Sequence, residues 1–260
     1  MKNDIPAPLL VDPLDKLSQK DLQHVTVTDL VEALAVTTNE VALIQSITVG
    51  QRDNPLWMDA RQWRITASNF GRVCNRQRKP GYYPPSLLKL IIGDYGQPVS
   101  AALEWGSSHE DIAIQTYEQK TGQTVYPCGF FISDSHPFLG ASPDGIVFGD
   151  DDEMGLIEIK CPFKYRDSMI CKACDNKHFH LEKYGNDTKL RRTHDYFYQV
   201  TGQLAITDAV FCDFVTWTCS DIHIERIYLD ITLWSSMLQE LTAFYFNSLG
   251  PEIIDRLHSM

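Results

Sequence analysis

The sequence lacks a long apolar run, a signal-peptide pattern and an internal repeat. No stretch approaches the roughly 18 to 20 apolar residues of a membrane-spanning helix, and the opening MKNDIPAPLLVDPLDK has no apolar core of the kind that directs secretion. These absences argue against a membrane protein and a solenoid, and they predict an intracellular protein. With 260 residues, 43% of them hydrophobic, the chain can bury a full core, and we expect a single compact domain overall.

Disulfide bonds are not expected either. The seven cysteines are an odd number, scattered along a chain long enough to fold without cross-links, so we expect free thiols. Cys171 and Cys174, followed by His178 and His180, have the composition of a zinc site. Their C-x2-C-x3-H-x-H spacing is crowded, which favours free cysteines and surface histidines. Cys161 has no recognisable His or Asn partner, and we interpret it as a packing residue rather than a nucleophile.

Positive charge is in deficit, since the formal net charge is −11. Nonspecific coating of nucleic acid needs an excess of Lys and Arg, so the charge argues against that class. It does not exclude a local groove, because basic residues gather in two segments. These are Arg72, Arg76, Arg78 and Lys79, and then Lys183, Lys189, Arg191 and Arg192. Charge alone favours two solvated faces over a binding groove.

The chain is predicted to consist of a helical lead-in, residues 1–50, and an α/β region, residues 51–260. Helix-start residues predict helices over 29–35 and 40–48 in the lead-in. In the second region the predicted helices are 55–63, 66–74, 100–120, 195–206 and 233–249, and the predicted strands are 124–132, 143–148, 154–160, 211–218 and 223–229. Residues 161–192 are predicted to be an irregular polar stretch.

The segment SPDGIVFGDDDEMGLIEIKCP predicts a β-hairpin with an acidic turn centred near Asp151. Side chains alternate along a strand, so Glu158 and Lys160 share one face, and the isoleucines beside Glu158 share the other. Antiparallel pairing about residue 151 places Asp144 across from Glu158, because both lie seven positions from that centre. The hairpin therefore predicts that two carboxylates and an ammonium group meet at one point.

Two carboxylates on one strand face are costly when buried alone, because each raises the pKa of the other. A divalent cation removes this cost, and oxygen ligands suit Mg²⁺ or Mn²⁺. Such an ion can polarise a phosphate ester and lower the pKa of a bound water, which Lys160 could orient. A surface hairpin with a salt bridge from Lys160 to a neighbouring acid explains this segment equally well.

Glu110 favours the metal interpretation. Helical spacing places it on an inward stripe with Leu103, Gly106, Ala113 and Tyr117, beside a second stripe that contains Ile112. Its neighbour Asp111 faces the other way, so a generic charged helix does not explain Glu110. An inward carboxylate needs a partner, which a metal site supplies. A buried pair with Arg or Lys is the alternative.

Two further patterns offer polar groups to a ligand. Gln199 and Gln203 are four apart on one helix face, where amides can bind a phosphate, a water or a base edge. For two glutamines in isolation, a solvent-facing pair is the simpler interpretation. The turn from Thr66 to Ser68 offers hydroxyl and N–H groups at a helix N-terminus, beside Arg61, which could clamp a terminal phosphate. An ordinary helix cap beside a surface arginine also explains these residues.

In order and spacing, these segments resemble one known family. W-x3-R-x3-ITAS, WGSSHE, SPDG, EIKCP and QVTGQ match the pattern of the lambda-exonuclease and YqaJ viral recombinase family over about residues 48 to 250. The length of 161–192 is most similar to YqaJ-type alkaline exonucleases of animals and large DNA viruses, and Trp63 stands where the family often has glycine. The resemblance implies an α/β fold with a PD-(D/E)XK restriction-endonuclease-like core, a central mixed β-sheet flanked by helices.

The resemblance also implies a Mg²⁺-dependent deoxyribonuclease that degrades duplex DNA from 5′-phosphorylated ends in the 5′→3′ direction, in recombination or DNA processing. Asp144 and Glu158 would hold one or two Mg²⁺ or Mn²⁺ ions with the backbone carbonyl of Ile159. Glu110 would support the metal through a water, and Lys160 would assist the attacking water. The implied catalytic set is Glu110, Asp144, Glu158, Lys160 and Gln199, and the implied DNA-binding set is Arg61, Thr66, Ser68 and Gln203.

Alternatives to this activity are a structure-selective endonuclease on the same core and a non-catalytic DNA-end-binding module. The presence of both acids of the hairpin, Lys160 and Glu110 disfavours the binding module, which has no use for all four. By the same resemblance, the protein could be a monomer or a homotrimer and could act with a recombinase that anneals single strands. We expect a nuclear location if the source is a eukaryote or a virus that replicates in the nucleus, and a cytoplasmic one otherwise.

Overall fold

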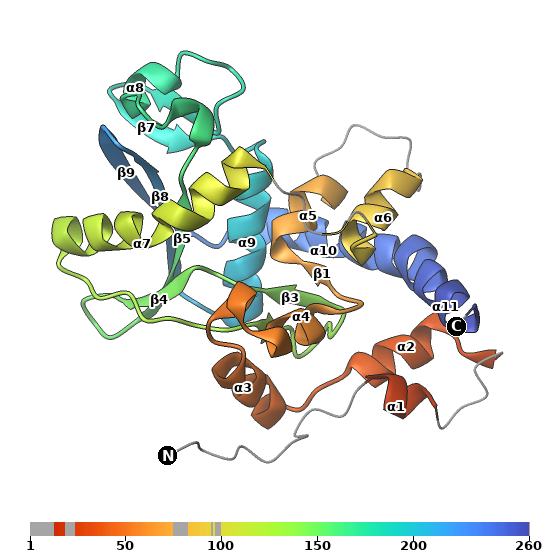
Figure 1. Ribbon diagram of the computed structural model, residues 1–260. Helices are drawn as coiled ribbons and strands as arrows, with labels where there is room; N and C mark the ends of the chain where they lie inside the picture. The colour runs from red at the N-terminus through yellow and green to blue at the C-terminus, as the bar shows by residue number, and fades with distance from the viewer. Residues whose placement is uncertain (1–12, 19–23, 75–82, 95, 97–99, 260) are drawn as a thin grey trace.

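The computed structural model describes residues 13–18, 24–74, 83–94, 96 and 100–259, and Figure 1 labels its elements. Arg76, Arg78 and Lys79, most of the first basic cluster, lie outside the described residues. The described residues of the predicted lead-in, 13–18 and 24–50, contain helices, as predicted, and mainly helical elements follow. These elements are α1 (Pro13–Leu17), α2 (Val27–Leu34), α3 (Thr38–Ile47), η2 (Gln51–Asp53), α4 (Pro55–Arg61) and α5 (Ala67–Cys74). Helices α2 and α3 begin two residues earlier than predicted, because capping boxes form at Thr26 and Thr37.

The centre of the molecule is a four-stranded mixed sheet. Its strands are β4 (Gly145–Phe148), β5 (Met154–Lys160), β8 (Phe211–Thr218) and β9 (Asp221–Tyr228), in that spatial order. Strand β5 pairs parallel with β8, whereas the two outer pairs are antiparallel. Helix α7 (Ala101–Thr121) packs on one face and α9 (Asp195–Thr207) on the other (Figure 1). This arrangement confirms the predicted mixed sheet flanked by helices.

Alternation along β5 determines which side chains meet which helix. Ile157 and Ile159 pack in one hydrophobic cluster with Ala113 and Tyr117 of α7. Leu156 packs in the other cluster, with residues of α9. Glu158 follows the period of Leu156 and is therefore directed to the α9 side of the sheet, as the strand pattern predicts.

A smaller sheet was not predicted. It consists of β1 (Ile65–Thr66), β3 (Leu139–Ala141) and β2 (Phe131–Ile132), with β1 parallel to β3 and β2 antiparallel to it. Strands of two or three residues are too short to show the period-two alternation on which a sequence prediction depends. The sheet fixes the start of α5, because β1 leads directly into that helix.

Residues 161–192 are folded, which corrects the prediction of an irregular stretch. They form η3 (Phe163–Tyr165), α8 (Ile170–Ala173) and an antiparallel hairpin of β6 (Leu181–Tyr184) and β7 (Asp187–Leu190). Apolar residues of this segment join the α9 side of the core; they include Ile170, Phe179, Leu181 and Leu190. The polar composition misled the prediction because these few apolar positions are far apart in the sequence yet pack in one cluster.

Helices α5 and α9 lie unusually close together. A Cβ at Gly71 would be 2.5 Å from the backbone of Asp195, and a Cβ at Gly202 would overlap the ring of Phe70. The two glycines therefore allow the helices to approach, as small residues do at tight crossings. The Thr66–Ser68 turn lies at the start of α5, the helix that packs against α9.

The C-terminal helices enclose a second core. These C-terminal elements are α10 (Ile231–Phe244), the π-helical η4 (Tyr245–Leu249) and α11 (Gly250–His258). Helix α6 (Pro85–Ile92) lies much earlier in the chain, before α7. Leu30 and Leu34 of α2 pack in one cluster with Ile253 and Leu257 of α11, so the lead-in and the C-terminus lie together (Figure 1). Within the described residues no single helix meets the length and hydropathy of a membrane span; α2 and α3 do so only as a pair bent by 69°.

Candidate active site

The predicted hairpin register is correct. Gly145 pairs with Ile157, so the pairing is centred on residue 151 and the next pair along brings Asp144 opposite Glu158. Asp144 lies just before β4, and its Oδ2 accepts a 2.6 Å hydrogen bond from the backbone N–H of Ile159. The pairing therefore brings together the two carboxylates that the sequence singled out.

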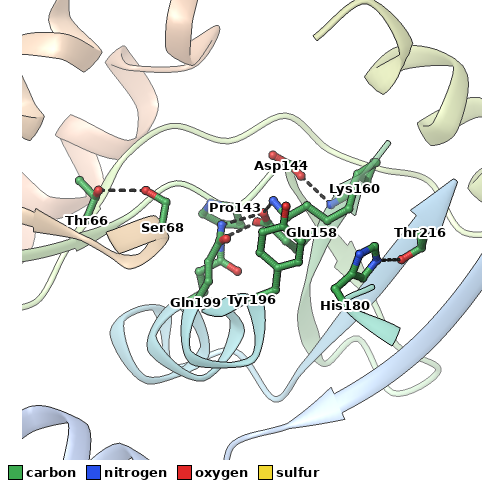
Figure 2. A network of polar contacts seen from close by, with 12 residues as sticks. Thr66, Ser68, Pro143, Asp144, Glu158, Lys160, His180, Tyr196, Gln199 and Thr216 are labelled. Atoms are coloured by element: carbon green, nitrogen blue, oxygen red, sulfur yellow. Dashed lines mark hydrogen bonds and ion pairs between the residues drawn. The ribbon is translucent and has the colours of Figure 1, made fainter. Parts of the chain in front are cut away.

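Glu158 is buried, with 1% of its surface exposed, and its carboxylate is surrounded by donors (Figure 2). Lys160 Nζ forms a short ion pair with Oε1. Gln199 Nε2 donates to the same oxygen at 2.7 Å, and Gln203 Nε2 donates to Oε2 at 2.6 Å. Donors on both oxygens hold the buried carboxylate in one orientation.

The two glutamines correct two expectations. Both are buried, so the solvent-facing interpretation is wrong. Gln203 has no exposed surface and cannot reach DNA as placed; its amide instead orients Glu158, which corrects the predicted DNA contact. Gln199 also donates to Glu158, so its direct partner is the carboxylate and not an exposed phosphate. The pattern of polar and apolar residues along α9 does not predict this burial, because the helix is buried on more than one side. Thr201 and Gly202, which lie between the two glutamines, are buried as well.

The charged groups around Glu158 shift one another's pKa values. Burial raises the pKa of Asp144 well above its usual value, and the charges of Glu158 and Glu110 raise it further. Burial also raises the pKa of Glu110, and Glu158 adds to this rise. For Lys160, burial alone would lower the pKa, but its interactions with Glu158, Tyr196 and Asp144 together outweigh burial and the pKa is raised. Lys160 is therefore an ammonium group at neutral pH, in a site with more acids than bases.

A cavity of about 690 Å³ opens onto these groups. Glu110, Asp144, Ile159 and Lys160 line it. Glu110 is half-buried and Asp111 is exposed, as the helical spacing predicted. Leu103 and Ile112, which were expected on the buried stripes, are each 45% exposed; the α7 residues that are fully buried against the sheet are Ala113 and Tyr117.

The donors present fit a hard divalent cation. Within the described ranges, no group of three or more His, Cys, Asp or Glu side chains is spaced to hold a metal ion. The ion's protein ligands would then be two carboxylates and a backbone carbonyl, with water or phosphate oxygens completing the shell, as is usual for Mg²⁺. A positive charge there would relieve the repulsion that raises the pKa of Asp144. Glu110 would be a supporting group and not a third direct ligand.

The predicted phosphate-binding residues lie outside the cavity lining. Thr66 and Ser68 share a 3.1 Å hydroxyl–hydroxyl hydrogen bond, and in the view of Figure 2 they lie on the far side of Gln199 from Lys160. The guanidinium of Arg61 stacks 3.8 Å above the Trp57 ring. Burial lowers the pKa of Arg61 to about 10, so it remains charged at neutral pH, and no described carboxylate pairs with it.

Tyr196, His180 and Gln51 are among the cavity residues that were not predicted as part of the site. Tyr196 presents its ring 4.7 Å from Lys160 Nζ. His180 is buried beside it and bonds Thr216 Oγ1 through Nε2 at 2.7 Å, which corrects its prediction as a surface histidine. Burial lowers the pKa of His180 well below its usual value, so the ring is neutral. Gln51 completes the wall from η2. The sequence signal that could have indicated Tyr196 is its position among the aromatic residues of DYFYQVTGQ, the segment that also carries the two glutamines.

All seven cysteines are free, as predicted. Cys171, Cys174, His178 and His180 form no group spaced to hold a metal ion among the residues described, and the preference for free cysteines over a zinc site there stays a prediction. Burial raises the pKa of Cys161 to about 12, which agrees with a packing role.

Comparison with known proteins identifies the family. The sequence model of the YqaJ-like viral recombinase domain matches residues 56–210, more than half of the chain. The chain belongs to this family. The match contains the Arg61–Ser68 region, the β4–β5 hairpin and α9, so each group of predicted site residues in this YqaJ-like protein lies inside it.

Individual relatives agree. The alkaline nuclease of Orgyia pseudotsugata multicapsid polyhedrosis virus is 29% identical over 161 residues, 61% of this chain and 34% of the relative. A second alkaline nuclease, from Autographa californica nuclear polyhedrosis virus, is also 29% identical, over 60% of this chain and 36% of that protein. The YqaJ-like chain thus spans about a third of the length of these curated relatives.

Solved structures show the fold. The alkaline exonuclease LHK-Exo from Laribacter hongkongensis is 26% identical with a TM-score of 0.57, covering 78% of this chain and 95% of its own. The Shutoff and Exonuclease Protein of Kaposi's sarcoma-associated herpesvirus is 13% identical with a TM-score of 0.56, covering 94% of this chain and 80% of its own. The YqaJ-like chain therefore has the PD-(D/E)XK fold of these exonucleases.

Proposed function

We propose that this protein is a metal-dependent deoxyribonuclease, an exonuclease that degrades duplex DNA from 5′-phosphorylated ends in the 5′→3′ direction during recombination or DNA processing. The observation that carries this proposal is that Asp144, Lys160 and Glu110 line one cavity, and that the buried Glu158 pairs with Lys160 directly behind that lining. The names of the relatives, alkaline nucleases and an alkaline exonuclease, support the same activity.

In this proposal Asp144, Glu158 and the backbone carbonyl of Ile159 hold one or two Mg²⁺ ions, which Mn²⁺ can replace. When bound, the metal polarises the scissile phosphate and lowers the pKa of the attacking water. Gln199 and Gln203 keep the Glu158 carboxylate in one orientation. This fixed orientation supports catalysis because a misplaced ligand weakens a metal site sharply.

Lys160 and Glu110 handle charge around the attacked phosphate. The ammonium group of Lys160 is paired with Glu158 yet 20% exposed toward the cavity, so it can also orient the attacking water and stabilise negative charge on the phosphate. Glu110 has a raised pKa, which suits a carboxyl group that would hold or release a proton beside the attacked phosphate.

The 5′ polarity rests on Arg61, Thr66 and Ser68. Arg61 is a charged, half-buried group without a described acidic partner, which is the environment in which a guanidinium binds a phosphate strongly. Trp57, on which Arg61 stacks, donates through Nε1 to Ser142 Oγ at 2.8 Å. Since Ser142 lies two residues before Asp144, this contact connects the proposed 5′-phosphate pocket to the proposed metal site.

The test is digestion of a linear duplex labelled at either 5′ end, phosphorylated or not, with Mg²⁺. We expect the label to be released first from phosphorylated 5′ ends. Lys160→Ala should be inactive, and Lys89→Ala, which removes a charge from exposed α6, should retain activity. Cleavage of covalently closed circular duplex would support an endonuclease instead. An intact duplex with both Mg²⁺ and Mn²⁺, together with tight binding to ends, would overturn the catalytic proposal in favour of an end-binding module.

Partners and assembly are further parts of the proposal. A single-strand annealing recombinase would use the strand that 5′→3′ digestion exposes, and a homotrimer would enclose the duplex and favour long digestion tracts. Sedimentation of the protein with and without DNA distinguishes the trimer from a monomer.

A further inference from the structure

Part of the cavity wall comes from a segment upstream of the family match. Gly50, Gln51, Arg52 and Asp53 line the cavity, and the match begins at residue 56. Residues 51–53 form η2, the short turn between α3 and α4. The catalytic predictions used none of these residues.

The turn is anchored to the loop that carries Asp144. Gln51 Nε2 donates to the carbonyl of Pro143 at 2.7 Å and to that of Cys128 at 3.3 Å. The backbone of Gln51 is left-handed, with φ +43°, and follows Gly50 at φ +90°. A side-chain-bearing residue adopts this conformation at a cost of about 1 kcal/mol or more, so the surrounding bonds must hold it. The backbone that leads into Arg52 is therefore anchored to the loop that carries Asp144.

Arg52 reaches from this turn to α7. Its Nη1 donates to Ser107 Oγ at 3.3 Å. Ser107 lies three residues before Glu110, and residues at that spacing share a helix face. Both residues line the cavity, and Arg52 is exposed, so its guanidinium lies at the cavity surface near the helix that carries Glu110.

The charges lining the cavity make Arg52 distinctive. The acidic residues in the lining are Asp53, Glu110, Asp111 and Asp144. The basic ones among the residues described are Arg52 and Lys160, and Lys160 is already paired with Glu158. Arg52 forms no ion pair with any carboxylate that the structure describes; its polar partner is the neutral Ser107. A phosphodiester entering this acidic cavity would meet Arg52 as a cation still available for pairing.

We propose that Arg52 is a substrate-binding residue that contacts a backbone phosphate of the DNA strand in the cavity. This inference rests on the proposed function and names a contact within that site. A planar guanidinium binds phosphate oxygens in a bidentate manner, and the bond to Ser107 holds it in position beforehand. Gln51 acts as a positioning residue, since it fixes the turn against the Asp144 loop.

The test measures binding without cleavage. A fluorescein-labelled duplex with 5′-phosphorylated ends is titrated in EDTA, and anisotropy is followed at several salt concentrations. Arg52→Ala should raise Kd about tenfold, the expected loss of a charge-assisted contact, and should reduce the slope of log K against log salt by about 1. Arg52→Lys should keep the slope and recover part of the affinity, because it retains charge without the planar fork. Lys89→Ala, an exposed charge outside the cavity, should match wild type.

Two results would overturn the proposal. Wild-type affinity and slope in Arg52→Ala would show that no phosphate contact is made, and an equal loss in Lys89→Ala would show a bulk charge effect. Thermal melting checks that Arg52→Ala is folded. The proposed function fails separately: if the wild type binds duplex but never cleaves it with Mg²⁺ or Mn²⁺, the anisotropy comparison still decides the role of Arg52. With active enzyme, Arg52→Ala should raise KM more than it lowers kcat.

Discussion

Glu158 and Asp144 face each other across one strand pair, yet they are held differently. Glu158 is buried and receives donors from Lys160, Gln199 and Gln203. Asp144 lines the cavity and accepts one described hydrogen bond, from the backbone of Ile159. The protein has therefore stabilised the charge of one carboxylate through its own side chains, whereas the other faces acids and lacks a compensating donor set.

The difference indicates that the two carboxylates have different roles. A carboxylate with all its donors in place is oriented before any ligand arrives, so Glu158 is a pre-oriented group. Asp144 has a raised pKa because burial and neighbouring acids oppose its charge, so its ionised form needs an external cation. Sites of this kind are less stable than they could be, because function requires the unfavourable charge.

The largest effect should follow from removing the pre-oriented carboxylate. Glu158→Gln leaves Lys160 without its ion pair in a buried setting, so we expect activity to fall by about a thousandfold and stability to fall by about 3 kcal/mol. Initial rates on linear duplex and urea denaturation measure the two effects. Glu104→Gln, on the exposed side of α7, is the matched control. A stable, active Glu158→Gln would mean that the three donors around Glu158, namely Lys160, Gln199 and Gln203, have no functional role.

Substitutions of the two glutamines test separately how much each donor contributes to holding Glu158. Gln203 supplies the described donor to Oε2, whereas Oε1 also receives Lys160. Gln203→Leu should therefore cost about 2 kcal/mol of stability and about tenfold in rate, and Gln199→Leu should cost less than 1 kcal/mol on the same scale. Chemical denaturation of both variants ranks them. The reverse ranking would show that Gln199 carries the orientation of Glu158.

Replacing Asp144 should raise the stability of the protein, whereas replacing Glu158 should lower it. The folded-state pKa of Asp144 is raised, so in metal-free buffer its contribution to stability is full below the unfolded value of about 4 and is lost as pH rises toward the folded value. Asp144→Asn should remove this loss, and we expect it to be inactive yet about 1 kcal/mol more stable at pH 7. Thermal melts in EDTA from pH 4 to pH 8 measure the difference. If wild type and variant show the same pH profile, the contrast with Glu158 is wrong.

The sequence predicted this contrast only in part. The period-two alternation and the acidic turn were sufficient to bring Asp144 and Glu158 together, because hairpin register follows from local pattern. The donors to Glu158 were not predictable, because Gln203 is buried where α9 meets β5, in a contact between residues 45 positions apart in the sequence. A polar residue on an amphipathic helix gives no sign of such packing.

Trp63 shows a second limit. It stands where the family often has glycine, and its backbone is left-handed, with φ +63°. The conformation is one that glycine adopts without strain. Here it is held from both sides: Tyr245 donates to the Trp63 carbonyl at 3.1 Å, and the next residue, Arg64, is buried with bonds to three carbonyls. The family resemblance thus holds for the backbone at this position although the side chain differs.

Tyr196 gives the smallest predicted effect and tests whether Lys160 depends on Glu158 alone. The ring lies 4.7 Å from Lys160 Nζ, and a cation at a ring face is stabilised by about 0.5 to 1 kcal/mol. Tyr196→Phe keeps that face and should retain nearly full activity, whereas Tyr196→Leu should lower kcat about threefold. Single-turnover rates compare the two. Equal losses in both variants would assign the effect to the phenol hydroxyl, and no loss in Tyr196→Leu would show that the ion pair with Glu158 is sufficient to position Lys160.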